Sequence, residues 1–128
     1  MAERIGAIVI TRNEASNIEA CLASLDFCDS RMVVDSFSSD DTVERACPLA
    51  DLVVRRDFLN HAEQKNWAID QLATEWVFIL DADERVPAGL AAEIRRCVDG
   101  GRHDGWWIRR SNWFFGEWAS EISTSRLA

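Results

Sequence analysis

The sequence has little positive charge and no long hydrophobic run. Of its 128 residues, 14 are Lys or Arg and 22 are Asp or Glu, so the formal net charge is −8. A broad nucleic-acid-binding face needs clustered cations to neutralise phosphates, and this balance argues against one. A small phosphorylated ligand needs only a few local cations or a metal ion. The apolar run Ile5 to Ile10 is too short to cross a membrane, and the N-terminus lacks the shape of a signal peptide.

The spacings of metal sites and disulfide frameworks are also absent. Cys21, Cys28, Cys47 and Cys97 include no CxxC pair, and three of them fall within helix-like patterns. We therefore interpret them as small buried hydrophobic residues of a protein in the reducing cytoplasm. No internal repeat or linker interrupts the chain, whose length fits one domain.

Apolar runs alternate with amphipathic stretches along the chain. The runs at 5–10, 32–34, 52–54, 76–80 and 106–108 predict five strands. Helical periodicity predicts helices over 15–25, 61–73 and 87–100, and N-cap residues followed by a proline predict a short helix that ends before residue 48. This order predicts an α/β fold, a three-layer sandwich with a mostly parallel sheet and helices on both faces.

Carboxylates follow the predicted strands within one to four positions. The segments to inspect are 11–14, 35–36, 55–57 and 81–84. In α/β sheets of this kind, ligands bind beyond the carboxyl ends of the strands. A sheet built only for stability does not need charged residues there, so we expect a ligand site at this edge.

The fourth predicted strand ends in the acidic doublet Asp81 and Asp83. If the chain is still extended there, both side chains point to the same side. Two carboxylates about 4 Å apart repel by roughly 4 kcal/mol at an effective dielectric near 20, and a divalent cation reverses the sign of that interaction. Oxygen ligands suit Mg²⁺ or Mn²⁺. A lone DxD is also typical of a solvated turn or a helix N-cap, but its place after the most apolar strand favours the metal.

A phosphatase is a competing interpretation of the same doublet. Haloacid-dehalogenase-like phosphatases carry a nucleophilic Asp in a DxDx[TV] motif after a buried strand. Here the series from Asp81 to Arg85 lacks the hydroxyl or β-branched residue, and it follows the fourth strand instead of the first. The pattern disfavours this alternative.

The helix predicted over 61–73 carries unusual residues on its buried side. On a helical wheel His61 and Lys65 share the buried arc, Asn66 lies at its edge, and Trp67 points outward. Burying an unpaired ammonium is costly, and helix N-termini favour anions. A pyrophosphate at this helix N-terminus accounts for these residues together with the DxD. The alternative is that Lys65 reaches solvent or pairs with Asp57.

Four segments in order resemble the family-2 glycosyltransferases of the GT-A fold. They are Ile8 to Glu14 with Asn17, Ile18, Leu22 and Leu25; Val33 to Ser36 with Ser39 to Thr42; Gln64 to Ala68; and Phe78 to Glu84. Together they span roughly residues 5 to 90. Two further stretches, His61 to Asn66 and Arg109 to Gly116, resemble the bacterial lipopolysaccharide-core glucosyltransferases within that family.

The resemblance implies a role for each candidate site residue. It assigns substrate binding to Thr11, Asn13, Glu14, Asp35, His61, Lys65, Asn66 and Asp81. Among these, Asp35 would accept hydrogen bonds from the base or ribose, and Lys65 would face the diphosphate. Asp83, with Asp81, would hold Mg²⁺ or Mn²⁺ that bridges the diphosphate and stabilises it as it leaves.

The reaction implied is transfer of a hexose from a nucleotide-diphosphate sugar, UDP-glucose first, onto a saccharide or lipid-linked acceptor with inversion. Inversion needs a general base, which in the family comes from the acceptor-binding half. Beyond Asp104 the only carboxylates are Glu117 and Glu121, and neither stands in a family-like motif. We therefore expect a donor-binding domain over 1–118 with an unrelated tail over 119–128, in a truncated or frameshifted chain that lacks the base. The alternative is a nucleotide-sugar-binding fragment without catalysis.

The last part of the chain is rich in aromatic residues. Trp106, Trp107, Trp113 and Trp118 lie there with Phe114 and Phe115, and Arg109 and Arg110 lie among them. One interpretation is a sheet edge that packs against a missing C-terminal half. The other is an acceptor or membrane-interface surface, with the protein peripheral at the inner membrane face. In both cases we expect self-association through this segment.

Overall fold

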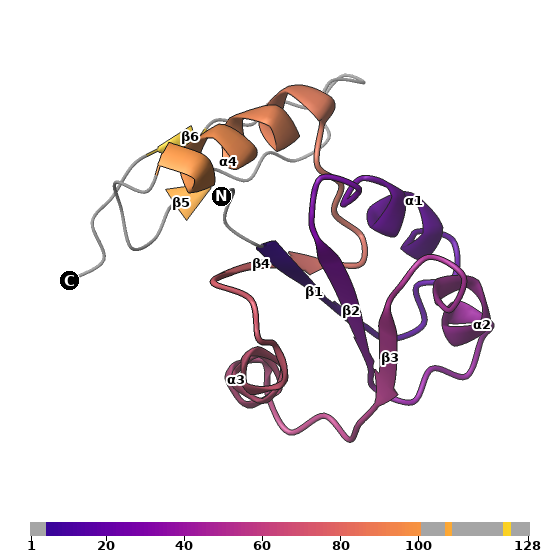
Figure 1. Cartoon of the computed structure of the whole chain (residues 1–128). Helices are drawn as coiled ribbons and strands as arrows, with labels where there is room; N and C mark the ends of the chain where they lie inside the picture. The colour runs from indigo at the N-terminus through magenta and orange to yellow at the C-terminus, as the bar shows by residue number, and fades with distance from the viewer. Residues whose placement is uncertain (1–4, 101–106, 109–121, 124–128) are drawn as a thin grey trace. The chain divides into compact units, whose positions relative to one another are not determined.

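The computed structural model of the protein describes residues 5–100, 107–108 and 122–123. Contacts divide the chain into two compact units, one over residues 3–86 and one over residues 87–128. The first unit contains all the strands of the larger sheet and three of the helices (Figure 1).

The first unit alternates strands and helices as the sequence predicts. Its elements are β1 (Ile5–Thr11), α1 (Ile18–Ala23), β2 (Ser30–Asp35), α2 (Thr42–Ala46), β3 (Leu52–Arg55), α3 (His61–Gln71) and β4 (Trp76–Asp81). The four strands form one parallel sheet in the order β3-β2-β1-β4. The predicted α/β class and the first four strands are therefore confirmed.

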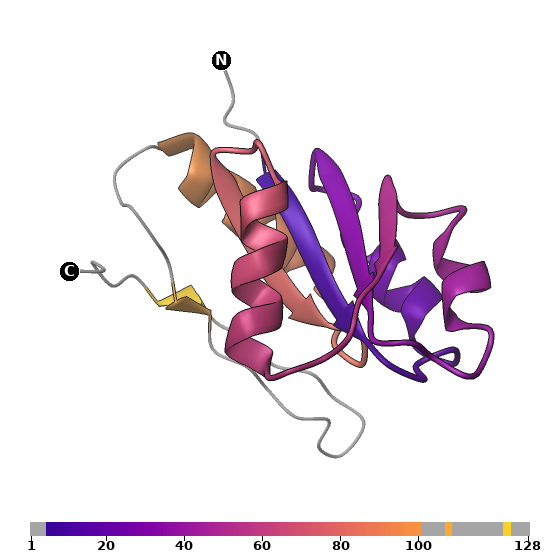
Figure 2. The same ribbon diagram turned by 90° about the horizontal axis from the view of Figure 1, so that it is seen from below.

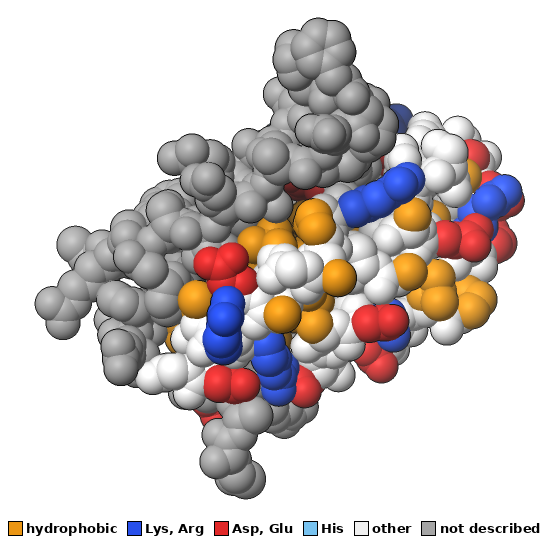
Figure 3. Space-filling model, turned by 90° about the horizontal axis from the view of Figure 1, so that it is seen from above, with side chains coloured by type: hydrophobic (Ala, Val, Ile, Leu, Met, Phe, Trp, Pro, Cys, Tyr) orange, Lys and Arg blue, Asp and Glu red, His pale blue; other side chains and the backbone are white. Residues whose placement is uncertain are grey.

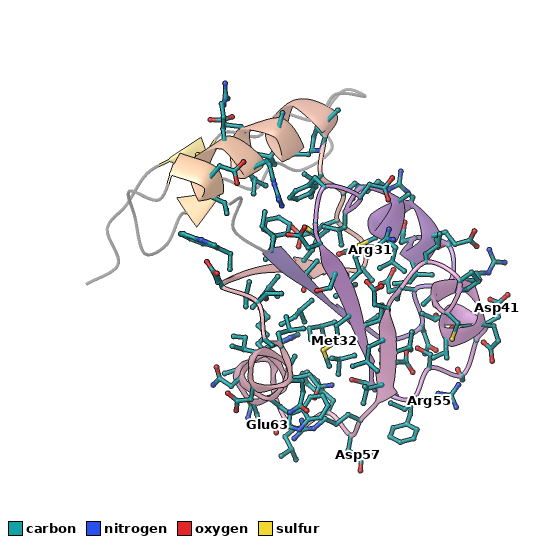
Figure 4. The ribbon with its side chains drawn as sticks, viewed as in Figure 1. Arg31, Met32, Asp41, Arg55, Asp57 and Glu63 are labelled. Atoms are coloured by element: carbon teal, nitrogen blue, oxygen red, sulfur yellow. The ribbon has the colours of Figure 1, made fainter. Side chains whose placement is uncertain are left out.

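Helices cover both faces of this sheet. α1 and α2 lie on one face and α3 on the other (Figures 1 and 2). Side chains alternate along a strand, so Ile8, Met32 and Val34 face α3 and pack in one cluster with Ala68. Figure 4 shows Met32 in this position, between β2 and α3. Because β1 has neighbours on all sides, its side chains are almost completely buried, as a continuous apolar run predicts.

α3 presents a different face to the sheet from the one that its apolar residues predict. Gln64 is completely buried and Trp67 packs against the core, whereas Ile69 is 38% exposed. The prediction that Trp67 points outward is wrong. The side-chain amide of Gln64 is hydrogen-bonded to Arg56 and Ser36, so a polar residue occupies the centre of the buried face. A pattern of apolar residues cannot predict that such a polar residue is buried.

The second unit contains α4 (Ala88–Gly100) and a short antiparallel pair, β5 (Trp107–Ile108) with β6 (Ile122–Ser123). The buried residues of α4 repeat every four positions, as predicted: Leu90, Ile94 and Val98. The prediction that the fifth strand joins the parallel sheet is wrong, because β5 pairs with β6 in a separate two-stranded sheet. The predictions for Trp106 and for residues 109–121 lie outside the described residues.

The cysteines are free and differ in burial. Cys21 is buried, Cys28 and Cys97 are half-buried, and Cys47 is exposed. The interpretation as buried hydrophobic residues is thus confirmed for Cys21 and wrong for Cys47. Cys47 is the C-cap of the short helix α2, where the chain turns at the surface.

We expect Ile8→Ala to lower the free energy of unfolding by about 2–5 kcal/mol, because it opens a cavity in the middle of the sheet. The matched control is Leu59→Ala. Leu59 is 74% exposed, so its truncation should change that free energy by no more than about 0.5 kcal/mol. Urea denaturation followed by circular dichroism measures both. Equal losses in the two variants would contradict the described core.

Candidate functional site

A pocket of about 360 Å³ opens at the carboxyl edge of the parallel sheet. It lies where the sequence predicts a ligand site, and its volume suits a small organic ligand. The ends of β1, β2 and β4 with the segments after them, the loop before α3 and the start of α3 supply its lining: Ile10, Thr11, Arg12, Glu14, Ser36, Phe58, His61, Asp81, Ala82 and Asp83.

The structure brings together about half of the residues that the sequence nominates. Those that line the pocket are Thr11, Glu14, His61, Asp81 and Asp83. Those outside its lining are Asn13, Asp35, Lys65 and Asn66. The lining also includes Arg12, Ser36 and Phe58, which the site prediction omitted. Arg12 and Ser36 stand in the segments after β1 and β2, so their position was a usable signal, whereas nothing in the sequence singles out Phe58.

Thr11, the last residue of β1, carries an unsatisfied polar atom. The residue is 3% exposed, and its hydroxyl has no hydrogen-bond partner within the described part of the chain. Leaving a buried hydroxyl unpaired costs about 1–3 kcal/mol. Thr11 lines the pocket as a residue, while its hydroxyl oxygen is itself buried.

The acidic doublet lies on a turn, and the chain is not extended there. β4 ends at Asp81, and the Glu84 amide donates to the Asp81 carbonyl at 2.9 Å. In return, the Asp81 amide donates to Glu84 Oε1 at 3.0 Å. The strand-alternation argument for the two carboxylates therefore does not apply. Asp81 and Asp83 line the same pocket because this turn carries them both there.

Helix α1 supports this turn from the core. The Cys21 thiol donates to the Asp81 carbonyl at 3.7 Å, and Ser24 Oγ accepts from the Val86 amide at 3.0 Å. Burial, with the nearby charges of Glu84 and Asp83, raises the pKa of Cys21 to about 12. The thiol therefore stays protonated and remains a donor at neutral pH.

The donor set fits a divalent cation shared with a ligand. Among the described residues, no group of three or more His, Cys, Asp or Glu side chains is placed to hold a metal ion. Three carboxylates line the pocket among the described residues, those of Glu14, Asp81 and Asp83, and the last two stand on the same turn. Mg²⁺ typically takes one or two protein carboxylates and completes its shell with water and phosphate oxygens. The residues thus fit such an ion and do not form a closed protein cage.

Asn13 and Asp35 join the loops after β1 and β2. Asn13 has a positive φ of 53°, its amide donates to Ser38 Oγ at 2.8 Å, and its Oδ1 accepts from the Ser39 amide at 2.7 Å. Asp35 is completely buried and accepts from both the amide, at 2.9 Å, and the hydroxyl of Ser38. Arg55 Nε lies 3.9 Å from the same carboxylate. These contacts fix the shape of the two loops at the pocket edge.

A second set of hydrogen bonds joins the same two loops a few residues further along the chain. The Glu14 amide donates to Thr42 Oγ1 at 3.0 Å, and the Ala15 amide donates to Asp40 Oδ2 at 3.3 Å. Asp40 accepts in addition from the hydroxyl and the amide of Thr42. The hydrogen bond from the Thr42 hydroxyl is the largest of several contacts that lower the pKa of Asp40. This carboxylate is therefore charged at neutral pH.

His61 at the start of α3 lines the pocket but is exposed, so the prediction that it lies on the buried side of the helix is wrong, and Lys65 does not line the pocket. His61 packs edge-on against Phe58 with ring centroids 5.0 Å apart, and both line the pocket. Lys65, the only lysine of the sequence, is half-buried one turn later. No ion pair joins it to Asp57 within the described residues. Arg12 is the only described Lys or Arg side chain in the lining.

Solved structures identify the fold as that of the GT-A glycosyltransferases. A mannosyltransferase from Pyrobaculum calidifontis, in complex with GDP-Man and Mn²⁺, matches with a TM-score of 0.63 and 31% identity over 74% of this chain and 32% of that one. Glucosyl-3-phosphoglycerate synthase from Mycobacterium tuberculosis, in complex with Mn²⁺, UDP and glucosyl-3-phosphoglycerate, matches with a TM-score of 0.66 over 89% of this chain and 45% of that one. Its identity of 22% shows the fold alone.

The chain belongs to glycosyl transferase family 2, whose family model matches residues 7–121. An uncharacterised glycosyltransferase of Rickettsia conorii is 37% identical over 95 residues, which are 73% of this chain and 34% of that protein. The lipopolysaccharide core biosynthesis glycosyltransferase LpsC of Rhizobium meliloti is 30% identical over 93 residues, 67% of this chain and 34% of LpsC. The chain thus spans about a third of the length of these relatives. Family membership sets the phosphatase interpretation aside.

We expect Cys21 to resist alkylation in the folded protein, because its thiol is buried and its pKa of about 12 leaves almost no thiolate at pH 8. The exposed Cys47 is the internal control and should react at the rate of an ordinary thiol. Iodoacetamide labelling mapped by mass spectrometry, with and without urea, measures both rates. Rapid labelling of Cys21 without urea would contradict the support that α1 gives to the acidic turn.

Proposed function

We propose that this chain binds the donor of a family-2 glycosyltransferase that transfers a hexose from a nucleotide-diphosphate sugar with inversion. The observation that carries the proposal is the pocket at the carboxyl edge of the sheet. There a buried unpaired hydroxyl, a cationic side chain and an acidic pair meet in a chain of this family. We propose UDP-glucose as the first donor to test.

Each pocket group matches one part of such a donor. Thr11 would lie against the nucleoside, Arg12 would offset the negative charge of the diphosphate, and His61 would donate a hydrogen bond to it. Asp81 and Asp83 would hold the cation, which when bound would stabilise the charge that develops on the departing diphosphate. The described carboxylates alone give this pocket an excess of negative charge, which a divalent cation would offset.

The remaining nominated residues surround this set. Asn13 and Asp35 would act through the loops that they fix, with Asp35 beside the base or ribose. Glu14 would lie along the nucleotide. Lys65 and Asn66 would approach the diphosphate from outside the pocket lining.

The names of the relatives support the ligand class. The Pyrobaculum mannosyltransferase was solved with GDP-Man and Mn²⁺, and the mycobacterial synthase was solved with UDP-glucose and Mn²⁺ and with UDP and Mg²⁺. LpsC is named for lipopolysaccharide core biosynthesis. On these grounds we propose Mg²⁺ or Mn²⁺ as the cation, a saccharide or lipid-linked acceptor, and a part in lipopolysaccharide synthesis.

The general base is not among the groups that we assign. Inverting transfer needs a carboxylate that takes the proton of the acceptor hydroxyl. In this proposal Asp81 and Asp83 hold the cation, and we assign the base to none of the described residues. The second candidate function is nucleotide-sugar binding without turnover. It is favoured because no general base is assigned among the pocket residues.

We propose that the protein acts in the cytoplasm, peripheral at the inner membrane face, where a lipid-linked acceptor is accessible. No helix in the described ranges is long and apolar enough to cross a membrane. On the face drawn in Figure 3, the described Lys and Arg side chains are interspersed with Asp and Glu and form no broad basic patch. This pattern supports a small anionic ligand over a nucleic acid.

We expect UDP-glucose to bind in the presence of Mn²⁺ and to lose its affinity at least about tenfold in EDTA, because the cation bridges protein and diphosphate. Asp83→Asn should cause the same loss in the presence of Mn²⁺. The control is Asp70→Asn, an exposed carboxylate on α3 that does not line the pocket. Isothermal titration calorimetry measures all three affinities.

The outcomes separate the two candidate functions. Metal-dependent binding with measurable donor hydrolysis or transfer supports the transferase, and binding without turnover selects the binding module. Absence of binding by UDP, GDP and TDP sugars, with and without metal, would contradict both.

A further inference from the structure

Arg56, the residue after β3, links the end of the sheet to α3. Its amide donates to the Asp35 carbonyl at 2.8 Å, which extends the pairing of β2 with β3. Its guanidinium donates to Glu63 Oε2 at 2.7 Å and to Gln64 Oε1 at 2.8 Å, and its second terminal nitrogen also bonds the Glu63 carboxylate. Cζ lies 4.6 Å from the centroid of the Trp67 ring. One side chain therefore contacts the first two turns of α3 at three points.

These contacts continue to the pocket wall. Gln64, which is completely buried, donates from Nε2 to Ser36 Oγ at 3.2 Å, and Ser36 lines the pocket. His61, in the same helical turn as Glu63, lines the pocket as well. Arg56 does not line it. The polar network thus runs from Arg56 through Gln64 to Ser36 on the pocket wall, while His61 is linked to it through the backbone of α3.

The attachment of α3 to the sheet combines apolar packing with this polar network. Only Gln64 and Ala68 of this helix are fully buried, Trp67 packs against the core while partly buried, and Ile69 is 38% exposed. A two-pronged guanidinium–carboxylate pair fixes orientation as well as distance, and stacking on Trp67 adds to it. The Arg56 contact lowers the pKa of Glu63, so the pair stays charged at neutral pH. Without Arg56, Gln64 Oε1 would be buried without this donor.

We propose that Arg56 is a positioning residue for the donor pocket, which holds α3 in the orientation that places His61 on the pocket wall and Gln64 against Ser36. The expected loss of ligand affinity rests on the proposed function. The expected change in the pocket wall of the ligand-free protein is independent of it.

The test compares Arg56→Met with Arg31→Met. Arg31 is a matched control, since its side chain is 23% exposed against 25% for Arg56, and it too pairs with a carboxylate, Asp26, and a carbonyl, that of Leu22. Neither arginine lines the pocket. Both variants should lower the melting temperature, so a loss of stability alone does not distinguish a positioning role from a purely structural one. Arg56→Lys keeps the charge but loses the two-pronged contact.

The first readout needs no ligand. In a carbon–proton correlation spectrum, the ring resonances of His61 and their contact with Phe58 should change in Arg56→Met and remain as in the wild type in Arg31→Met. Arg56→Lys should restore them only in part. Unchanged His61 resonances in a folded Arg56→Met protein would overturn the proposal.

The second readout is titration of UDP with Mn²⁺ present. The affinity should fall about tenfold in Arg56→Met, within the range of coupling through packed networks, and stay within about twofold in Arg31→Met. Equal losses in both variants would overturn the positioning role. If the wild type binds no UDP, the proposed function fails, while the His61 resonances still decide whether Arg56 holds the wall.

Discussion

The parallel pairing of β1 with β2 on one side and β4 on the other is the constraint on which the rest of the structure depends. Its register sets Thr11 opposite Asp35 and Ile10 opposite Asp81, and the next pairing sets Asp35 opposite Arg55. Residues far apart in sequence therefore reach the carboxyl edge at the same level. Because β1 is apolar and enclosed on both faces, a shift of this register would expose its core residues. The position of the polar groups thus follows from the burial of the apolar ones.

Short-range hydrogen bonds then fix the loops that leave this edge. Asn13 and Asp35 join the first two loops, Glu84 closes the acidic turn on itself, and Arg56 holds the start of α3. Two of the polar residues that the family resemblance assigns to the ligand are therefore already engaged within the protein. A site whose polar groups are held in place before binding loses less conformational entropy when a ligand binds. This reconciles a pocket lined by loops with the specificity that donor recognition needs.

The strands were predictable because a strand enclosed on both faces must be continuously apolar, as Ile5 to Ile10 is. Their carboxyl ends indicated where the pocket lies, and Asp81 and Asp83 were nominated in this way. The buried face of α3 was not predictable, since Gln64 is buried only because its amide has partners from two other segments. Phe58 was missed for a related reason: its place on the wall depends on the path of a loop.

The pairing of a strand could also not be predicted where its partner strand lies in a polar stretch of the sequence. β5 was expected at the edge of the parallel sheet, but it pairs with Ile122–Ser123, where composition gave no sign of a strand. The exposure of Cys47 likewise depends on where α2 ends, a boundary that cysteine spacing does not report. In each case a tertiary contact overrides a local pattern.

The central claim is that nucleotide-sugar and metal meet at the turn after β4. The most direct measurement is the broadening of amide resonances by paramagnetic Mn²⁺, with UDP-glucose present and Mg²⁺ as the diamagnetic reference. The account predicts broadening strongest at Asp83 and Asp81, extending to Thr11, and weak without the nucleotide sugar. Broadening centred on the exposed acidic residues of α2, such as Asp41 and Glu44, or unaffected by the nucleotide sugar, would contradict it.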